Sequence, residues 1–238
     1  MRALRLFSVV LAVTITAASA FAGSITIRTG QVAGAPGTCS GNDDSFRFYA
    51  PNPQCAQPIL PTAFTAADFA AACAGPQAVV INPYTPVWAG SLPCDPEARW
   101  IATGLYDTFT CYGAPTSALY CAPFTVESHC TVADSIKICW AVDDFLGDQP
   151  SYPGANPGGV YVNGTDLGPA FSGIGADQQY SAVAYNVPLL PGTNTLAVYQ
   201  RDAGCGLGGL ILSATVYTNC GTVGTEAQTW GKIKAIYR

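Results

Sequence analysis

The sequence predicts an all-β protein, a β-sandwich or barrel of short strands. Apolar residues alternate with other residues over several short segments, such as 135–142. Alternation with a period of two lets a strand bury one face and expose the other. One such segment runs directly into Asn163-Gly164, and Asn-Gly after a strand is the strongest short signal for a β-hairpin. The chain also holds 25 glycines and 18 prolines, which supply turns.

About nine strands are expected from this alternation. Pro123 lies inside one of them and indicates an edge position or a bulge, because proline has no N–H to donate to a sheet. No internal repeat at a fixed period is present, so the strands form one domain rather than an array. The expected strands span residues 24–28, 78–81, 99–103, 118–126, 136–142, 160–162, 182–187, 195–199 and 210–217.

One short helix is expected at residues 65–73. Thr65 is a suitable N-cap, and Asp68 follows three residues later. The polar, proline-rich segment 30–61 is expected to be irregular and to be pinned by its two cysteines, because long irregular segments in compact domains are usually fixed or functional.

The two ends of the chain differ from its strand-rich part. Residues 1–22 carry Arg2 and Arg5, a mostly apolar run and small residues at the end, which is the pattern of a secretory signal peptide. Residues 23–219 are expected to form the sandwich, and 220–238 a linker with a short basic and aromatic tail. No later apolar stretch is long enough to span a bilayer. These features predict a protein that is secreted or held at the cell surface.

Cysteine content supports export. All ten cysteines follow the expected signal peptide, and an even number in an exported chain predicts up to five disulfides. No Cys-x-x-Cys pair is present to suggest a zinc site. Sequence alone does not define the pairing, and neighbour pairing is favoured, first of all Cys111–Cys121, which would staple a hairpin-sized segment. The ten are Cys39, Cys55, Cys73, Cys94, Cys111, Cys121, Cys130, Cys139, Cys205 and Cys220.

The charge balance excludes one class of partner. The formal net charge is −5, and removal of residues 1–22 leaves 8 basic and 15 acidic residues, a net charge of −7. The basic residues are scattered, whereas nucleic-acid binding requires a basic patch that displaces counterions. A nucleic-acid partner is therefore not expected, and the oligomeric state is left open.

Three phrases of the sequence carry a resemblance to a known family. They are Val160-Tyr-Val-Asn-Gly164, Pro191-Gly-Thr-Asn-Thr-Leu196 and Gly206-Leu-Gly-Gly-Leu-Ile211. In this order, residues 24–218 resemble the galactose-binding-like β-sandwich of discoidin-type domains and many carbohydrate-binding modules. The resemblance implies a jelly-roll β-sandwich of two antiparallel sheets and a mostly non-catalytic binder of sugars or surfaces. The ten cysteines depart from the pattern of many relatives.

A carbohydrate ligand would be held by exposed aromatic rings and by flanking hydrogen-bonding groups. Trp100 and Trp140 lie within expected strands and are expected in the core. The other aromatic rings lie in loops or at strand ends, where local packing is the alternative. Arg201 and Asp202 follow a strand, where pairing with each other is the alternative. The candidate ligand-binding residues are Trp88, Tyr106, Tyr112, Tyr152, Tyr180, Asp43, Arg201 and Asp202.

An acidic cluster follows the expected strand 136–142. Asp143, Asp144 and Asp148 are candidate ligands of a structural calcium ion, which takes oxygen ligands from carboxylates and loop carbonyls. The alternative is a solvated turn whose aspartates bind backbone amides. No other cofactor is expected.

Catalytic groups are few. A glycosidase needs two carboxyl groups that face the sugar, and adjacent Asp143 and Asp144 would point to opposite faces of a strand, so a further aspartate would be required. We therefore expect no enzyme, but a secreted non-catalytic module that binds carbohydrate or a cell-surface polymer. The alternatives are a structural protein of the envelope or extracellular matrix, and a glycoside hydrolase built on a sandwich.

Overall fold

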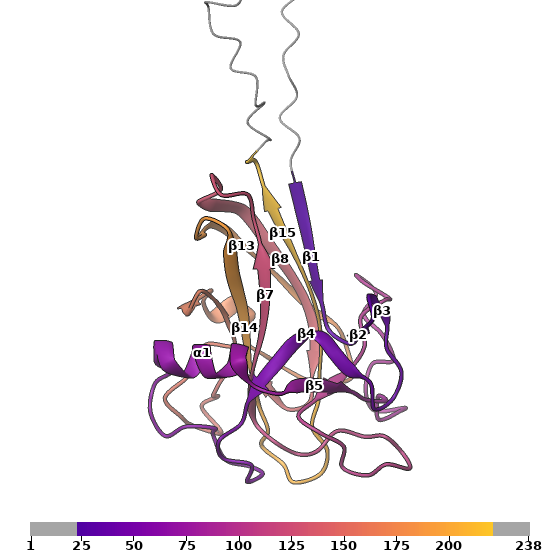
Figure 1. The fold of residues 1–238 in the computed structure, drawn as a ribbon. Coiled ribbons are helices and arrows are strands. Elements are labelled where there is room, and N and C mark those ends of the chain that lie inside the picture. Colours follow the sequence, from indigo (N-terminus) through magenta and orange to yellow (C-terminus); the bar gives the residue numbers. More distant parts are fainter. Residues whose placement is uncertain (1–22, 221–238) are drawn as a thin grey trace, which may run out of the picture.

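The computed structural model describes residues 23–220 and consists mostly of strands (Figure 1). It has fifteen strands, so the expected number of about nine is too low, although nine of the fifteen have three residues or more. These nine are β1 (Gly23–Arg28), β4 (Asn42–Tyr49), β5 (Gln77–Val80), β7 (Ala118–Thr125), β8 (Val132–Val142), β10 (Val160–Val162), β13 (Tyr180–Pro188), β14 (Thr193–Arg201) and β15 (Leu210–Thr218).

The remaining elements are short. The two-residue strands are β2 (Gln31–Val32), β3 (Ala35–Pro36), β6 (Ile101–Ala102), β9 (Phe145–Leu146), β11 (Thr165–Asp166) and β12 (Gly173–Ile174). One α-helix, α1 (Ala66–Ala74), and one 3-10 helix, η1 (Pro169–Phe171), complete the described part. The expected helix is confirmed at its start, where the Asp68 carboxylate accepts a hydrogen bond of 2.8 Å from the backbone N–H of Thr65.

The strands form one large curled antiparallel sheet rather than the two separate sheets expected. Its order is β11-β10-β14-β7-β4-β5-β6-β15-β8-β13, with β1 paired to β15 and β9 to β14. The half with β14, β7 and β4 is joined to the half with β15, β8 and β13 through the short strands β5 and β6. The backbone hydrogen bonds of the sheet therefore continue from one half to the other, whereas a β-sandwich would have two separate sheets.

The main core lies between these two halves. Tyr120 and Val198 belong to the β7–β14 half, and Trp140 and Leu212 to the β8–β15 half; all four are buried in one apolar cluster. On β8, Ile136, Ile138 and Trp140 point to this core, while Cys139 and Ala141 belong to a second cluster on the outer face. The alternation predicted for residues 136–142 is thus confirmed.

Two other layers cover the outer faces of the sheet. Helix α1 and the preceding loop pack Phe64 and Phe69 against Tyr161 and Tyr199 on the outer face of the β10–β14 region. The segment 82–100 covers the other half, where its residues pack with Cys139, Ala141 and Ile211. This second covering segment carries part of the candidate site.

The segment 30–61 is not irregular throughout, since it contains β4 and the small ribbon of β2 and β3. Its acidic residues interrupt the alternation of apolar and polar residues by which a strand is recognised in a sequence. Asp43 is fully buried, and its carboxylate accepts hydrogen bonds from the backbone N–H groups of Gly30, Ser45 and Phe46. Burial raises the pKa of Asp43. Asp43 therefore holds backbone turns and is not exposed to a ligand.

The hairpin predicted at Asn163-Gly164 is confirmed. Both residues have positive φ, 51° and 79°, as a type I′ turn requires. Val162 pairs with Thr165 across the turn between β10 and β11.

Four disulfides join residues far apart in the sequence, with Cα–Cα distances from 4.9 to 6.0 Å. The expected neighbour pair Cys111–Cys121 is wrong, because each of the two is joined to a distant segment instead. Cys94 and Cys139 are not joined to a partner. The pairs are Cys39–Cys111, Cys55–Cys205, Cys73–Cys121 and Cys130–Cys220.

The expected signal peptide at 1–22 and the tail after Cys220 lie outside the described residues. Within residues 23–220, no helix is long and apolar enough to cross a membrane. The described chain begins and ends at the same end of the molecule, because Gly23 pairs with Thr218 (Figure 1). At the opposite end, Val142 at the end of β8 pairs with Leu210 at the start of β15.

Candidate functional site

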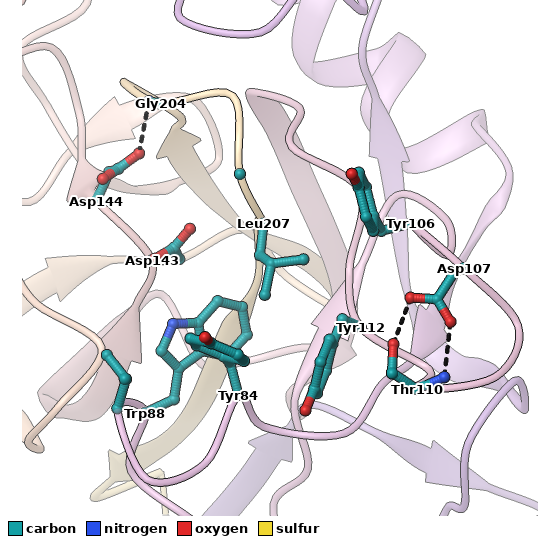
Figure 2. A pocket seen from close by; sticks show the side chains of 12 residues that line it. Tyr84, Trp88, Tyr106, Asp107, Thr110, Tyr112, Asp143, Asp144, Gly204 and Leu207 are labelled. Atoms are coloured by element: carbon teal, nitrogen blue, oxygen red, sulfur yellow. Dashed lines mark hydrogen bonds between the residues drawn. The ribbon is translucent and has the colours of Figure 1, made fainter.

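A cleft of about 640 Å³ opens where β8 ends and β15 begins. Three loops frame it: the loop after β5, the loop after β6 and the loop between β14 and β15. Its surface is mainly apolar and aromatic, with three aspartates (Figure 2). Twelve residues line it: Tyr84, Val87, Trp88, Tyr106, Asp107, Thr110, Tyr112, Asp143, Asp144, Gly204, Gly206 and Leu207.

Paired aromatic rings build one side of the cleft. Trp88 stacks on Trp100 with ring centroids 4.6 Å apart, and the Trp100 Nε1–H donates to the Ala89 carbonyl at 2.7 Å. Tyr84 packs edge-on against Tyr112 with centroids 5.3 Å apart. Trp88, predicted as a ligand residue, lies in the cleft but is only 5% exposed, so the Trp88 ring serves mainly as a fixed wall.

Exposed apolar side chains gather at the rim. Tyr84, Val87 and Tyr106 line the cleft and are 40%, 52% and 61% exposed. Phe109 is 98% exposed at the tip of the loop that carries Tyr106. The Asp107 carboxylate fixes this tip by accepting a hydrogen bond from the Thr110 N–H at 2.7 Å. Tyr106, a predicted ligand-binding residue, thus lines the cleft, and sequence reasoning missed Tyr84, which lines it as well.

The opposite side of the cleft is acidic. Asp143 and Asp144 follow the last residue of β8, and Asp144 adopts a positive φ of 63°. The Asp144 Oδ2 accepts hydrogen bonds from the backbone N–H groups of Ala203 and Gly204, at 2.7 and 3.0 Å (Figure 2). Asp144 therefore holds the loop between β14 and β15 in place.

Asp202 completes a group of three interacting carboxyl groups. Asp202 is fully buried, and its Oδ1 accepts from the Gly204 N–H at 2.8 Å. Its Oδ2 is buried without a donor. The carboxyl groups of Asp144 and Asp202 lie beside each other and interact. When one of the two carries a proton, it can donate a hydrogen bond to the other. Asp202, predicted as a ligand-binding residue, adjoins this cluster, but its side chain is buried and does not line the cleft.

These contacts raise the pKa values of two of the three carboxyl groups. Burial, and then repulsion by Asp144 and Asp202, raise the pKa of Asp143 to about 8, while a hydrogen bond from Trp88 acts in the opposite direction. Burial and the nearby Asp144 raise the pKa of Asp202 to about 7. Asp143 therefore keeps its proton at neutral pH and is able to donate a hydrogen bond into the cleft.

A second hollow of about 610 Å³ adjoins the cleft and shares Val87, Trp88, Asp143 and Asp144 with it. Tyr180, one of the candidate aromatic residues, lines this hollow. Tyr152 packs on Phe145, a lining residue, with ring centroids 5.4 Å apart. The candidate aromatic residues thus surround two adjoining hollows rather than one.

Arg201 and Asp148 lie elsewhere, which corrects two predictions. They form a buried ion pair, with Arg201 Nε 3.2 Å from Asp148 Oδ1. Arg201 also donates to the backbone carbonyls of Asp202 and Ala56. Asp148 accepts hydrogen bonds from the Tyr199 hydroxyl and the Asn156 N–H. Arg201 is 2% exposed, so it stabilises the fold and does not reach a ligand.

The expected calcium ligands are therefore divided. Asp143 and Asp144 share the cleft, whereas the charge of Asp148 is already compensated by Arg201. Among residues 23–220, no group of three acidic, histidine or cysteine side chains is arranged to hold a metal ion. Calcium binding by Asp143 and Asp144 stays a prediction.

No protein-family model and no curated protein matches the sequence. The chain aligns with a GH26-CBM35 β-(1,4)-mannanase from Podospora anserina at a TM-score of 0.29 and 15% identity, over 82% of this chain and 27% of that chain. It aligns with isomalto-dextranase from Arthrobacter globiformis T6, solved with panose, at a TM-score of 0.30 and 13% identity, over 81% and 23% of the two chains. The chain spans about a quarter of the length of both proteins. The resemblance to galactose-binding-like domains stays a prediction.

Proposed function

We propose that this protein is an exported, non-catalytic module that binds carbohydrate in the cleft. The observation that carries the proposal is the gathering of exposed aromatic rings, Tyr84 and Tyr106, around carboxyl groups at one end of the molecule. Binding sites for small molecules combine apolar walls with a few placed polar groups. The apolar faces of sugar rings would stack on the aromatic side chains, and the sugar hydroxyls would bond to Asp143 and Asp144.

The charge of the site favours neutral sugars. Asp144 contributes negative charge, and the protein as a whole has a formal charge of −5. No arginine or lysine lines the cleft. An anionic sugar would meet like charges there without a cation to compensate them. Neutral hexose polymers are therefore the proposed ligand class.

Export is part of the proposal. Four disulfides within residues 23–220 are typical of proteins that fold in an oxidising compartment. Together with the signal peptide predicted at 1–22, they support a protein that is secreted or presented at a cell surface.

The test is retention on a panel of neutral and acidic polysaccharides, followed by titration of the best ligand. Tyr84→Ala and Tyr106→Ala, which change two exposed rings that line the cleft, should each weaken binding by about tenfold, equivalent to ~1.4 kcal/mol. Tyr185→Ala is the matched control, because Tyr185 is 70% exposed on β13 and does not line the cleft. Equal losses in all three variants would contradict the proposed site. Concentration-dependent assembly without retention on any glycan would support the structural role instead.

A glycoside hydrolase is the second candidate, and one observation favours it. Asp143 and Asp144 both line the cleft and do not point to opposite faces, because they follow β8 instead of lying within a strand and Asp144 has a positive φ. A protonated carboxyl beside ionised ones is the arrangement that general acid catalysis of glycoside hydrolysis needs. Asp143 would be the acid in that case.

Product analysis separates the two candidates. A binding module leaves the retained polysaccharide intact, whereas a hydrolase releases reducing ends. Asp143→Asn should abolish the release of reducing ends while retention on the polysaccharide persists. If no reducing ends appear with any retained ligand, the hydrolase is ruled out for that ligand.

A further inference from the structure

Two of the ten cysteines remain outside the four disulfides, and they lie together. Cys139 is buried on the outer face of β8, and Cys94 lies in the segment 82–100 that covers this face. The Cys139 thiol lies close enough to the Cys94 thiol to affect its ionisation. Cys94 has an exposed side, so a reagent from solution can reach it.

Neighbouring contacts fix the two cysteines against each other. Cys139 pairs with Ser213 of β15, and the Ser213 hydroxyl donates to the carboxylate of Asp95 at 2.7 Å. Asp95 follows Cys94 directly and also forms an ion pair with Arg28 at 2.9 Å. On its other side, the Cys94 backbone N–H donates to the Gln179 side chain at 2.8 Å. The segment is thus held at the point where the two thiols meet.

We propose that Cys94 and Cys139 are an oxidisable pair that closes a fifth disulfide and fastens the segment 82–100 to strand β8. The same segment carries Trp88, which is a wall of the cleft. The proposal concerns the covalent structure and does not depend on the nature of the ligand.

The reaction requires a disulfide oxidant, such as oxidised glutathione. The exposed Cys94 thiolate attacks one sulfur of the oxidant and displaces a glutathione thiolate. The Cys139 thiolate then attacks the Cys94 sulfur of the mixed disulfide and displaces the second glutathione thiolate. The two cysteines lose two electrons and two protons, and the oxidant is reduced to two glutathione molecules.

The local environment disfavours the thiolate form of Cys94. Burial, and then the contact with Cys139, raise the pKa of Cys94 to about 12. Because the thiolate is the attacking species, few molecules react at a given moment near neutral pH. Oxidation therefore has to be followed until the thiol count no longer falls.

Trypsin offers a direct readout of the partner of Cys139. Cleavage after Lys137 and Arg201 yields the peptide 138–201, in which Cys139 is the only cysteine. The whole protein is oxidised with glutathione disulfide to constant thiol count, denatured, alkylated and digested without reduction. In the wild type we expect no free thiol, with 138–201 linked to other peptides until a reductant is added.

Cys94→Ser is the matched variant. It should retain one free thiol per molecule and release 138–201 with an alkylated Cys139. The proposal is overturned if the wild type releases 138–201 alkylated or joined to glutathione, or if this peptide stays linked to the rest in Cys94→Ser. Closure should also raise the Tm of the wild type above that of Cys94→Ser, by on the order of 10 °C.

Discussion

Trp88 and Trp100 lie against each other with ring centroids 4.6 Å apart and ring planes inclined by 29°. Both rings belong to the buried cluster on the outer face of β8 and β15, and Trp88 also forms a wall of the cleft. The stack therefore joins the wall of the candidate site directly to the folded body of the protein. We therefore expect a change in this pair to alter the shape of the cleft as well as the stability of the fold.

The first prediction compares the contributions of Trp88, which is buried, and Tyr106, which is exposed, to the stability of the protein. Trp88→Ala removes a buried ring from a packed stack and should lower the free energy of unfolding by roughly 3–5 kcal/mol. Tyr106→Ala, at a side chain that is 61% exposed, should change it by less than about 0.5 kcal/mol. Urea denaturation followed by circular dichroism measures both. Comparable losses in the two variants would show that Trp88 does not pack as described.

The second prediction concerns the buried ion pair of Arg201 and Asp148. Asp148→Asn leaves a buried guanidinium without its countercharge and should cost roughly 3–5 kcal/mol of stability. The double variant Asp148→Leu, Arg201→Met removes both charges and should lose clearly less, which denaturation midpoints will show. Glycan affinity of the folded Asp148→Asn protein should match that of the wild type. A selective loss of affinity would restore the ligand-binding role first assigned to Arg201.

Local sequence signals predicted the local structure well. The alternation of Ile136, Ile138 and Trp140 against Cys139 placed each side chain on its correct face, because the period of a strand is set by the backbone alone. The position of Pro123 within a strand is also explained by the backbone. β7 pairs with β4 only over Leu119–Cys121, so Pro123 lies where the side of β7 next to β4 is unpaired and no N–H is needed.

The arrangement of the sheet could not be predicted in this way. β4 was hidden because its first residues, Asn42-Asp43-Asp44-Ser45, are polar and bind local turns. The union of the two halves depends on β6, which has two residues and no distinctive pattern. The disulfides follow from the same topology: Tyr217 pairs with Ser135, which brings Cys220 near Cys130. Such pairs become predictable only when the strand register is known.

The candidate site was predicted only in part, because its geometry also depends on the strand register. Residue type pointed to Trp88, Tyr106 and Asp143, which line the cleft, but did not show which polar groups would already have partners in the fold. Asp43 is occupied by backbone amides, and Asp148 by Arg201. Interaction between Asp143 and Asp202 depends on the pairing of β9 with β14, in which Phe145 lies opposite Arg201, and the sequence does not encode this pairing locally.

The third prediction tests calcium. Repulsion by Asp144 opposes the ionisation of Asp143, and a bound cation would relieve this repulsion and release the proton of Asp143. Millimolar calcium should therefore raise the Tm of the wild type, and a chelator should reverse the effect. Asp144→Asn should abolish the response, whereas Asp148→Asn should keep it. A wild-type Tm that is unchanged by calcium and by chelator would remove calcium from the description of this site.

The fourth prediction is a loss of stability at alkaline pH. In the folded protein the pKa of Asp143 is about 8 and that of Asp202 about 7, whereas an unfolded aspartate has a pKa of about 3.9. Between these values the folded state binds more protons than the unfolded state, so the free energy of unfolding falls as the pH rises. The stabilisation is complete below about pH 4 and is lost as the pH rises through 7 and 8.

Thermal unfolding across this range gives the measurement. The Tm of the wild type should fall between about pH 5 and pH 9, and Asp143→Asn should flatten the fall, because an amide does not ionise. Asp166→Asn is the control, since Asp166 is exposed on β11 and remote from the three carboxyl groups of the cleft. If the wild type and Asp143→Asn lose stability in parallel, Asp143 does not carry the proton inferred here, and its role as a hydrogen-bond donor or acid in the cleft fails with it.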